Sequence, residues 1–280
     1  MALPPRPRRD APVGRPTRGT TGTNRLRRVD RWIARHPVLR RTDDPLVVDL
    51  GFGASAVTAL ELHARLTRER ADAHVIGLEI DQSRVDRANA QLADVRSGTT
   101  SFASDAAVSF ARGGFEVPMP GERRPVVIRA FNVLRQYDES DVAPAWARMT
   151  ARLQPGGLLV EGTCDEIGRV ASWVAVDDRC RPLSLTLSLR LRDLGSPAVA
   201  AERLPKALIH RNVAGEPVHA FLRDLVDAWE RAAPEGAFGP VHRWRRAVAV
   251  VAESGWPVLE RARVRLGEVT VPWASVAPRT

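Results

Sequence analysis

The sequence has 280 residues, 44% of them hydrophobic, so the chain is long enough to bury the core of one large α/β domain. No apolar run approaches the roughly 20 residues that cross a bilayer, and the N-terminus lacks the hydrophobic stretch of a secretion signal, so we expect a cytoplasmic protein with no membrane contact. The two cysteines, Cys164 and Cys180, have neither CxxC nor Cys/His spacing. The sequence therefore predicts neither a metal site nor a disulfide framework.

The formal net charge of +9 is concentrated at the N-terminus. Twelve Arg and two Asp lie within residues 1–41, and the rest of the chain sums to −1. Residues 1–23 are rich in Pro, Arg, Gly and Thr and cannot bury enough apolar surface to offset their ordering entropy, so we predict a disordered tail. This composition favours a solvated tail over an arm that binds RNA or a membrane surface. Residues 24–44 are predicted to form a short amphipathic helix, which ends near Pro37, and a linker.

From Pro45 onward, strand and helix patterns alternate. The predicted strands are residues 47–50, 74–80, 99–103, 125–131 and 158–162. Helices are predicted after the first four of them, beginning near residues 57, 83, 106 and 142. Strands that alternate with helices pair in parallel, because a hairpin leaves no room for a helix between its strands. The pattern therefore predicts a doubly wound, mostly parallel α/β sheet.

The last 110 residues have a different pattern. Residues 169–191 alternate around a polar turn, with leucine at every second position from 183 to 191, and predict a half-buried β-hairpin. Two amphipathic helices follow, and the chain ends in two alternating strands around Gly267. Compared with the short connections of a compact α/β unit, residues 165–240 form an inserted hairpin and helical element within a domain that spans residues 45–280.

Residues 47–62, VVDLGFGASAVTALEL, place a glycine-rich turn between the first strand and its helix. At such a turn, backbone N–H groups and the helix dipole face outward and can hold a ligand. GFGASA also fits the degenerate G-x-G-x-x-G/A fingerprint of dinucleotide sites, and a plain tight turn is a further alternative. However, the carboxylate of Asp49 suits a ligand with a cationic amino group and would repel a pyrophosphate. We therefore favour a site for a smaller ligand over a site for a nicotinamide dinucleotide, and a nicotinamide oxidoreductase stays as the least favoured alternative.

Four segments resemble, in order and spacing, the class I S-adenosylmethionine-dependent methyltransferases. VVDLGFGAS resembles the first motif of that family, hhDxGxGxG, with Ser55 where a third glycine is usual. VIGLEIDQSRVDRA resembles the second motif, with Glu79 at the end of its strand. ASDAA carries Asp105 after the third predicted strand, and RLQPGGLLVEG resembles the turn before the fifth. The resemblance runs from about Pro45 to Gly162 and implies a Rossmann-like sheet of the seven-stranded methyltransferase type.

The resemblance implies S-adenosylmethionine as the cofactor. Glu79 would accept hydrogen bonds from both ribose hydroxyls, and Asp105 would accept one from the adenine amino group, with Ala106 leaving room for the ring. Asp49 would engage the ammonium group of the methionine portion directly or through water. Ser55, which departs from the motif, is small and can cap the following helix. The implied cofactor-binding set is Asp49, Gly51, Gly53, Ser55, Glu79, Asp105 and Ala106. As an alternative, Glu79 and Asp105 are plain surface carboxylates.

The acceptor is expected over the end of the fourth strand, where residues 129–141 read RAFNVLRQYDESD. This segment lacks the Asn-Pro-Pro-aromatic sequence that marks methylation of amide or adenine nitrogens in the family. It also lacks the Pro-Cys pair used on pyrimidine carbon, so both subclasses are disfavoured. Methyl transfer mainly requires positioning of the acceptor and, for a hydroxyl, removal of a proton. The candidates for these roles are Asn132, Tyr137, Asp138 and His210, each of which could instead be an ordinary loop or capping residue. Further polar candidates nearby are Arg135, Glu161, Asp165, Arg211, Asn212 and His219.

We therefore predict a methyltransferase that acts on an unidentified acceptor, with a small molecule favoured and residues 165–240 determining acceptor specificity. Two alternatives remain open. The first is an RNA methyltransferase whose Arg-rich residues 1–41 bind phosphates. The second is a non-catalytic S-adenosylmethionine-binding protein, which is suggested by the missing third glycine.

Overall fold

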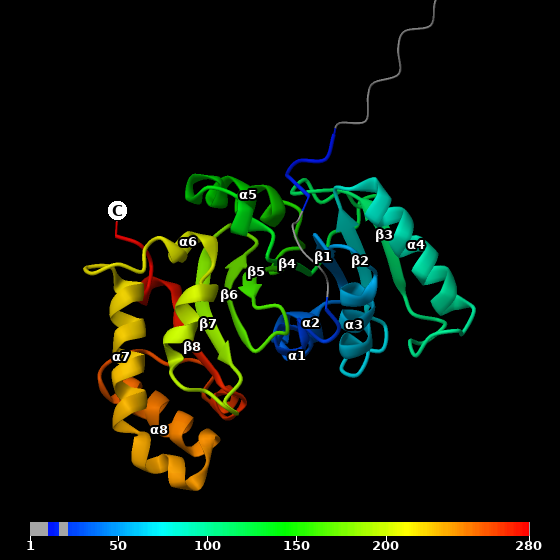
Figure 1. Cartoon of the computed structure of the whole chain (residues 1–280). Coiled ribbons are helices and arrows are strands. Elements are labelled where there is room, and N and C mark those ends of the chain that lie inside the picture. The colour runs from blue at the N-terminus through cyan, green and yellow to red at the C-terminus, as the bar shows by residue number, and fades with distance from the viewer. Residues whose placement is uncertain (1–10, 17–21, 280) are drawn as a thin grey trace, which may run out of the picture.

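The computed structural model describes residues 11–16 and 22–279, in which eight strands form one sheet in the order β3-β2-β1-β4-β5-β6-β7-β8 (Figure 1). The strands are β1 (Leu46–Leu50), β2 (His74–Glu79), β3 (Val108–Arg112), β4 (Val127–Phe131), β5 (Leu158–Cys164), β6 (Val170–Asp177), β7 (Pro182–Leu189) and β8 (Glu268–Pro272). Neighbours from β3 to β5 are parallel, whereas β6, β7 and β8 extend the sheet in antiparallel pairs. The predicted α/β sheet and the predicted hairpin are confirmed, and the hairpin belongs to the same sheet.

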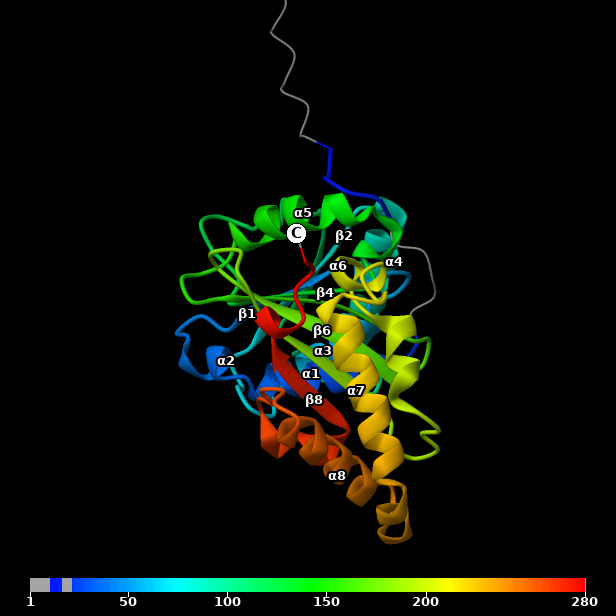
Figure 2. The same cartoon turned by 90° about the vertical axis from the view of Figure 1, so that its left-hand side faces the viewer.

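Helices cover both faces of the sheet, as Figures 1 and 2 show, which confirms the doubly wound arrangement. The helices are α1 (Arg27–Arg35), α2 (Pro37–Arg41), α3 (Val57–Leu66), α4 (Gln82–Arg96), α5 (Val142–Thr150), α6 (Lys206–Ile209), α7 (Pro217–Arg231) and α8 (Pro240–Glu253). Apolar side chains of α1, α3 and α4 form one core layer, and those of α5, α7 and α8 form the other. Because side chains alternate along a strand, Val47 of β1 faces the first layer and Val48 faces the second.

The third strand lies later in the chain than predicted. Residues 99–103 are not a strand, and β3 occupies Val108–Arg112, which was expected to be helical. Val108 and Phe110 are buried while Ser109 is exposed, the two-residue period of a strand. The Phe110 ring packs edge-on against Phe52, with centroids 5.0 Å apart, so a contact with the glycine-rich turn fixes this strand.

Two expectations for the C-terminal part are also wrong. Only the second of the two strands expected around Gly267 exists, because residues 261–266 form a 3-10 helix. Both faces of β7 are buried, so the hairpin is not half-buried. Its polar face is covered by α1 and the 3-10 helix: Arg28 Nη1 donates to Ser188 Oγ at 3.2 Å and to the Leu266 carbonyl at 3.0 Å.

Part of the predicted tail lies against the sheet. Residues 11–16 are described and contact the segments that follow β3 and β4, whereas residues 1–10 and 17–21 lie outside the described residues. In Figure 1 this dark-blue stretch lies near α5, away from α1 and α3. Within residues 11–16 and 22–279, no helix combines the length and apolarity needed to cross a membrane.

Candidate functional site

The strand order creates a topological switch point beside β1. The chain runs from β1 to β2 and β3 on one side, then returns to β4 on the other side of β1. In open α/β sheets, ligands bind at the carboxyl ends of the strands at such a point. A crevice lies there, and its walls include Gly51 after β1, Glu79 at the end of β2, Phe115 after β3 and Tyr137 after β4.

The glycine-rich turn and Glu79 meet in this crevice. Gly51 and Gly53 have φ angles of +71° and +87°, which glycine adopts without the penalty paid by other residues. Glu79 is 1% exposed, and its Oε2 accepts a hydrogen bond from the Gly53 N–H at 3.2 Å. Its Oε1 accepts from the Ile80 N–H at 2.9 Å, and Arg84 Nη1 lies 3.5 Å from Oε2. The structure therefore brings together the predicted residues Gly51, Gly53 and Glu79.

Asp49 is not part of the crevice. Its carboxylate faces the α1 and α3 layer, where Arg129 Nη2 lies 2.6 Å from Oδ2 and Arg129 Nε donates to Oδ1 at 3.0 Å. The Thr58 hydroxyl lies 2.9 Å from Oδ2 and 3.2 Å from the Phe52 carbonyl oxygen. Both carboxylate oxygens are thus engaged inside the protein. The Asp49 carboxylate is therefore not free to bind a ligand ammonium group, as was expected. The alternation of side chains along β1 turns Asp49 away from the crevice.

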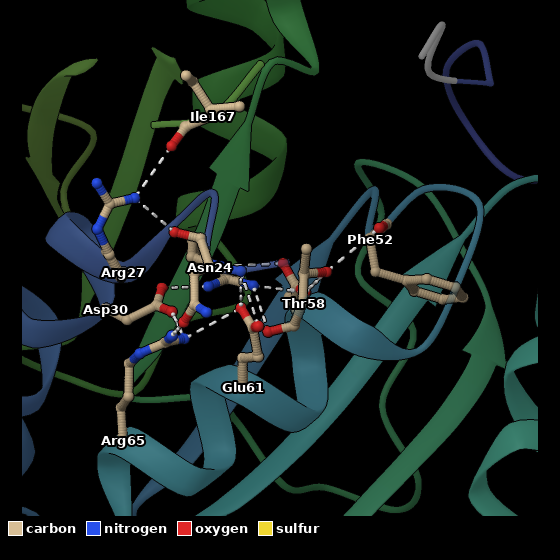
Figure 3. Close-up of polar contacts among 10 residues, drawn as sticks. Asn24, Arg27, Asp30, Phe52, Thr58, Glu61, Arg65 and Ile167 are labelled. Carbon is tan, nitrogen blue, oxygen red and sulfur yellow. Dashed lines mark hydrogen bonds and ion pairs between the residues drawn. The ribbon is translucent and has the colours of Figure 1, made fainter. Parts of the chain in front are cut away.

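Figure 3 shows the network of polar contacts around Asp30, Thr58, Glu61 and Arg65, to which Asp49 is joined through the Thr58 hydroxyl. Arg129 of β4 has no exposed surface and also pairs with Asp30 of α1. Arg65 of α3 lies 2.7 Å from the same Asp30 carboxylate and 3.3 Å from Glu61, and it donates to Asn24 Oδ1 at 2.5 Å. The network ties α1 to the sheet and to α3.

The charge of Arg129 is held by its surroundings. Burial alone would lower its pKa, but the charges of Asp49 and Asp30 outweigh burial and raise the pKa above that of an ordinary arginine. Arg129 is therefore always ionised, and its single positive charge lies between the Asp49 and Asp30 carboxylates, with Arg65 as a second cation on Asp30.

Asp105 and Ala106 lie near the amino ends of the strands, whereas Glu79 lies at the carboxyl end of β2. They precede β3, whose first residue Val108 pairs with Val75 near the start of β2, whereas Arg112 pairs with Glu79 at its end. Asp105 is exposed there. The expected crevice formed by three carboxylates is therefore not present, because β3 begins after Asp105 rather than before it.

The acidic residue that does follow β3 is Glu116, which the sequence analysis missed. Its Oε1 accepts a hydrogen bond from the Gly114 N–H at 2.8 Å, and its Oε2 accepts one from the Val13 N–H at 2.8 Å. A carboxylate was expected after the third strand, and the misplaced strand assigned that position to Asp105 instead of Glu116.

Ser55 lies in the turn, but the N-cap of α3 is Ala56, whose side chain cannot cap a helix. The Ala56 N–H instead donates to Gln91 Oε1 of α4 at 2.8 Å. The expected capping role of Ser55 is therefore filled by a side chain from a neighbouring helix.

Asn132 joins the ends of β4 and β5. Its φ of +58° is unusual for a residue other than glycine, although asparagine tolerates this region better than most. Its Oδ1 accepts from the Cys164 N–H at 3.0 Å, and its Nδ2 lies 3.3 Å from Cys164 Sγ. Both polar atoms of the Asn132 side chain therefore contact Cys164 and connect the end of β4 to the end of β5.

Tyr137 lines the crevice, and its hydroxyl accepts a hydrogen bond from the Arg15 N–H. Burial raises the pKa of Tyr137, and the Arg15 contact offsets this only in part, so the hydroxyl stays protonated at neutral pH.

Asp138 is exposed, and its N–H donates to Asp141 Oδ2 at 3.2 Å. His210 is exposed, with its Nε2 3.0 Å from Lys206 Nζ, and is not among the residues that line the crevice.

The segment after β4 contacts the loop that contains His210. Arg211 Nε lies 2.7 Å from Glu139 Oε1, and Arg135 Nη1 donates to the Glu202 carbonyl at 3.1 Å. These contacts place residues 165–240 beside the segment where an acceptor was expected.

Among the described residues, no group of three or more His, Cys, Asp or Glu side chains is arranged to hold a metal ion.

No model of a known protein family and no curated protein matches the sequence. Solved structures do align with it over part of its length. Magnesium protoporphyrin IX methyltransferase from Synechocystis, solved with bound S-adenosylhomocysteine, is 17% identical, with 50% of this chain and 54% of that chain covered and a TM-score of 0.36. Mitomycin 7-O-methyltransferase is 19% identical, with 50% and 36% covered and a TM-score of 0.36.

An O-methyltransferase family 2 protein from Planctomyces limnophilus, in complex with apigenin, is 18% identical, with 49% and 39% covered and a TM-score of 0.35. The chain thus spans between about a third and about half of the length of these three proteins. Similarities this low do not assign a function, which must come from the crevice itself.

Proposed function

We propose that this chain binds S-adenosylmethionine in the crevice at the carboxyl ends of β1 and β2 and transfers its methyl group to a small-molecule acceptor. One observation carries the proposal: the buried carboxylate of Glu79 lies 3.2 Å from the N–H of Gly53, at the topological switch point of the sheet. The two oxygens of a carboxylate have about four acceptor sites, so Glu79 can accept from the two hydroxyls of a ribose as well as from the Gly53 and Ile80 N–H groups.

The residues present fit the cofactor in part. Gly51 lines the crevice without a side chain, the Gly53 N–H holds Glu79, and Glu79 fits the ribose. Asp49 is paired with Arg129, so we assign the methionine end to the backbone of the turn rather than to this carboxylate. When bound, the cofactor supplies a methyl group on a positively charged sulfur, and the protein must orient the acceptor and exclude water.

A second hollow beside Tyr137 supports a small acceptor. With residues 13–15 forming one wall, it has a volume of about 310 Å³, within the range of small-molecule sites, and Asp141 and Arg148 are among the walls that remain when residues 13–15 move away. Within residues 165–240, Arg211 contacts Glu139 in the segment that follows β4 and contains Tyr137. We propose that residues 165–240 determine acceptor specificity.

The arginines of residues 22–41 argue against the RNA alternative. Arg25 Nε donates to the Asp165 carbonyl at 3.0 Å, Arg27 Nη1 donates to the Ile167 carbonyl at 3.0 Å, and Arg28 Nη1 donates to Ser188 Oγ of β7 at 3.2 Å. These cations hold the N-terminal helix on the sheet, which leaves fewer of them for phosphates. An RNA enzyme would bind single-stranded RNA with an affinity that falls steeply as salt rises.

Calorimetry with S-adenosylhomocysteine tests the proposal. Glu79→Gln keeps the shape of the side chain and one acceptor oxygen but removes the charge, so the Kd should rise by about tenfold or more. Asp94→Asn, on the exposed face of α4, is the matched control and should leave the Kd unchanged. Equal Kd values for Glu79→Gln and wild type would rule out this site. Transfer of a labelled methyl group to fractionated small metabolites then separates an enzyme from a non-catalytic binding protein.

A further inference from the structure

Residues 11–16, hereafter the strap, close the crevice. With the strap in place, the free volume inside is about 10 Å³, roughly the space of one water molecule. Val13 and Arg15 line this closed space and also the 310 Å³ hollow on the outer side. The strap is therefore the partition between two parts of one larger crevice, and a nucleoside cannot enter while it is docked.

The strap is held by specific contacts along its length. The Val13 N–H donates to Glu116 Oε2 at 2.8 Å, and the Val13 carbonyl accepts from the Phe115 N–H at 2.9 Å. The Arg15 N–H donates to the Tyr137 hydroxyl, and Gln136 Nε2 donates to the Arg15 carbonyl at 3.1 Å.

The shape of the crevice also fits the strap closely. Gly14 has a φ of +131°, and a Cβ there would lie 2.9 Å from both Ile80 Cδ1 and the Tyr137 hydroxyl. A Cβ on Gly114 would lie 2.1 Å from the Val13 carbonyl oxygen. Gly114 is needed for the close approach of two backbones, whereas Gly14 is needed for its positive φ and its contacts with two side-chain ends; a β-branched residue at position 14 would strain the docked backbone.

The backbone N–H and carbonyl of Val13, which belong to successive peptide groups, present a donor and an acceptor as a nucleobase edge does. Val13 offers one N–H to the Glu116 carboxylate and one carbonyl oxygen to the Phe115 N–H. Adenine offers an amino donor beside a ring-nitrogen acceptor. Glu116 and the Phe115 N–H follow β3, the strand next to the one that ends at Glu79. They could therefore bind either the strap or an adenine ring, but not both at once.

We propose that the strap is an intramolecular competitor that occupies the adenine end of the crevice and must leave before the adenosyl cofactor binds. This inference rests on the proposed function. The strap lowers the fraction of molecules that can bind, and the apparent Kd rises in inverse proportion to that fraction. Release of the strap would switch the protein from a closed to a binding-competent state.

The test uses the full chain and two glycine variants. Gly14→Val introduces a Cβ that collides with Ile80 and Tyr137 and should release the strap. Gly121→Val is the control: Gly121 also has a positive φ, +63°, but a Cβ there meets no atom within 4 Å. Thermal unfolding of both variants checks that the fold is retained. By calorimetry with S-adenosylhomocysteine, Gly14→Val should lower the Kd by about tenfold, whereas Gly121→Val should not.

Hydrogen exchange provides a second readout. In the wild type, the amides of Val13 and Arg15 should be protected without ligand and should lose protection at saturating S-adenosylhomocysteine. If all three chains bind with the same Kd, or if ligand increases the protection of these amides, the strap is not a competitor while the cofactor proposal survives. If Gly14→Val exposes the strap amides but no chain binds the ligand, the proposed function fails, and the competitor role fails with it.

Discussion

The buried Arg129 should be among the most sensitive positions in the fold. We consider the substitution Arg129→Met, which keeps the length and apolar stem of the side chain and removes its charge. The guanidinium has no exposed surface and contacts Asp49 at 2.6 Å and 3.0 Å as well as Asp30. After the substitution, Asp30 retains Arg65, but Asp49 retains only the Thr58 hydroxyl among these contacts.

Removing one partner of a buried ion pair costs about 3–5 kcal/mol, because the other charge remains buried without compensation. Arg129→Met should therefore lower the free energy of unfolding by this amount in urea denaturation followed by tryptophan fluorescence. Adding Asp49→Asn removes the stranded charge and should recover about 2 kcal/mol. Arg35→Met is the control: its partner is Glu69 at 3.3 Å, its side chain is 54% exposed, and the loss should stay below about 1 kcal/mol. The reasoning is refuted if Arg129→Met costs no more than Arg35→Met, or if adding Asp49→Asn makes the protein less stable still.

Two further substitutions test buried polar groups. Burial raises the pKa of Glu161 to about 8, and neither of its oxygens has a hydrogen-bond partner among the described residues. Because the folded pKa lies above the unfolded value, wild-type stability should be complete below pH ~4.5 and should fall as the pH rises through about 8. The free energy of unfolding of Glu161→Gln, relative to that of the wild type, should therefore increase by roughly 4 kcal/mol as the pH rises from ~4 to ~9. Parallel plots of unfolding free energy against pH for the two proteins would contradict this. For Asn132, held at a φ of +58° with its Oδ1 on the Cys164 N–H, Asn132→Ala should cost about 2 kcal/mol of unfolding free energy. Asn132→Gly should recover about 1 kcal/mol of that loss because glycine relieves the backbone strain, and equal losses for the two variants would show that strain plays no part.

The sequence was sufficient where the signal is local. The glycine-rich turn, the buried strand before it and the acidic end of the next strand follow from residue order alone, so Gly51, Gly53 and Glu79 were predicted together and lie together. The third strand was misplaced because VSFAR is too short for its period to separate a strand from a helix. That error moved the expected carboxylate from Glu116 to Asp105.

The remaining differences come from contacts between distant parts of the chain. Asp49 carries the same local pattern whether it faces a ligand or a cation, and the partner that decides this, Arg129, lies 80 residues away. Residues 11–16 have the composition of a solvated tail, yet Glu116 and Tyr137 bind their backbone. Backbone contacts of this kind leave little trace in side-chain composition.

A crystal structure of the full chain carrying Gly14→Val, grown with S-adenosylhomocysteine, tests the central claim most directly. The account predicts the ribose hydroxyls on the Glu79 carboxylate and the adenine amino group on Glu116, with Val13 displaced. Electron density for the nucleoside anywhere other than the carboxyl ends of β1, β2 and β3, with Glu79 still bonded only to protein atoms, would contradict it.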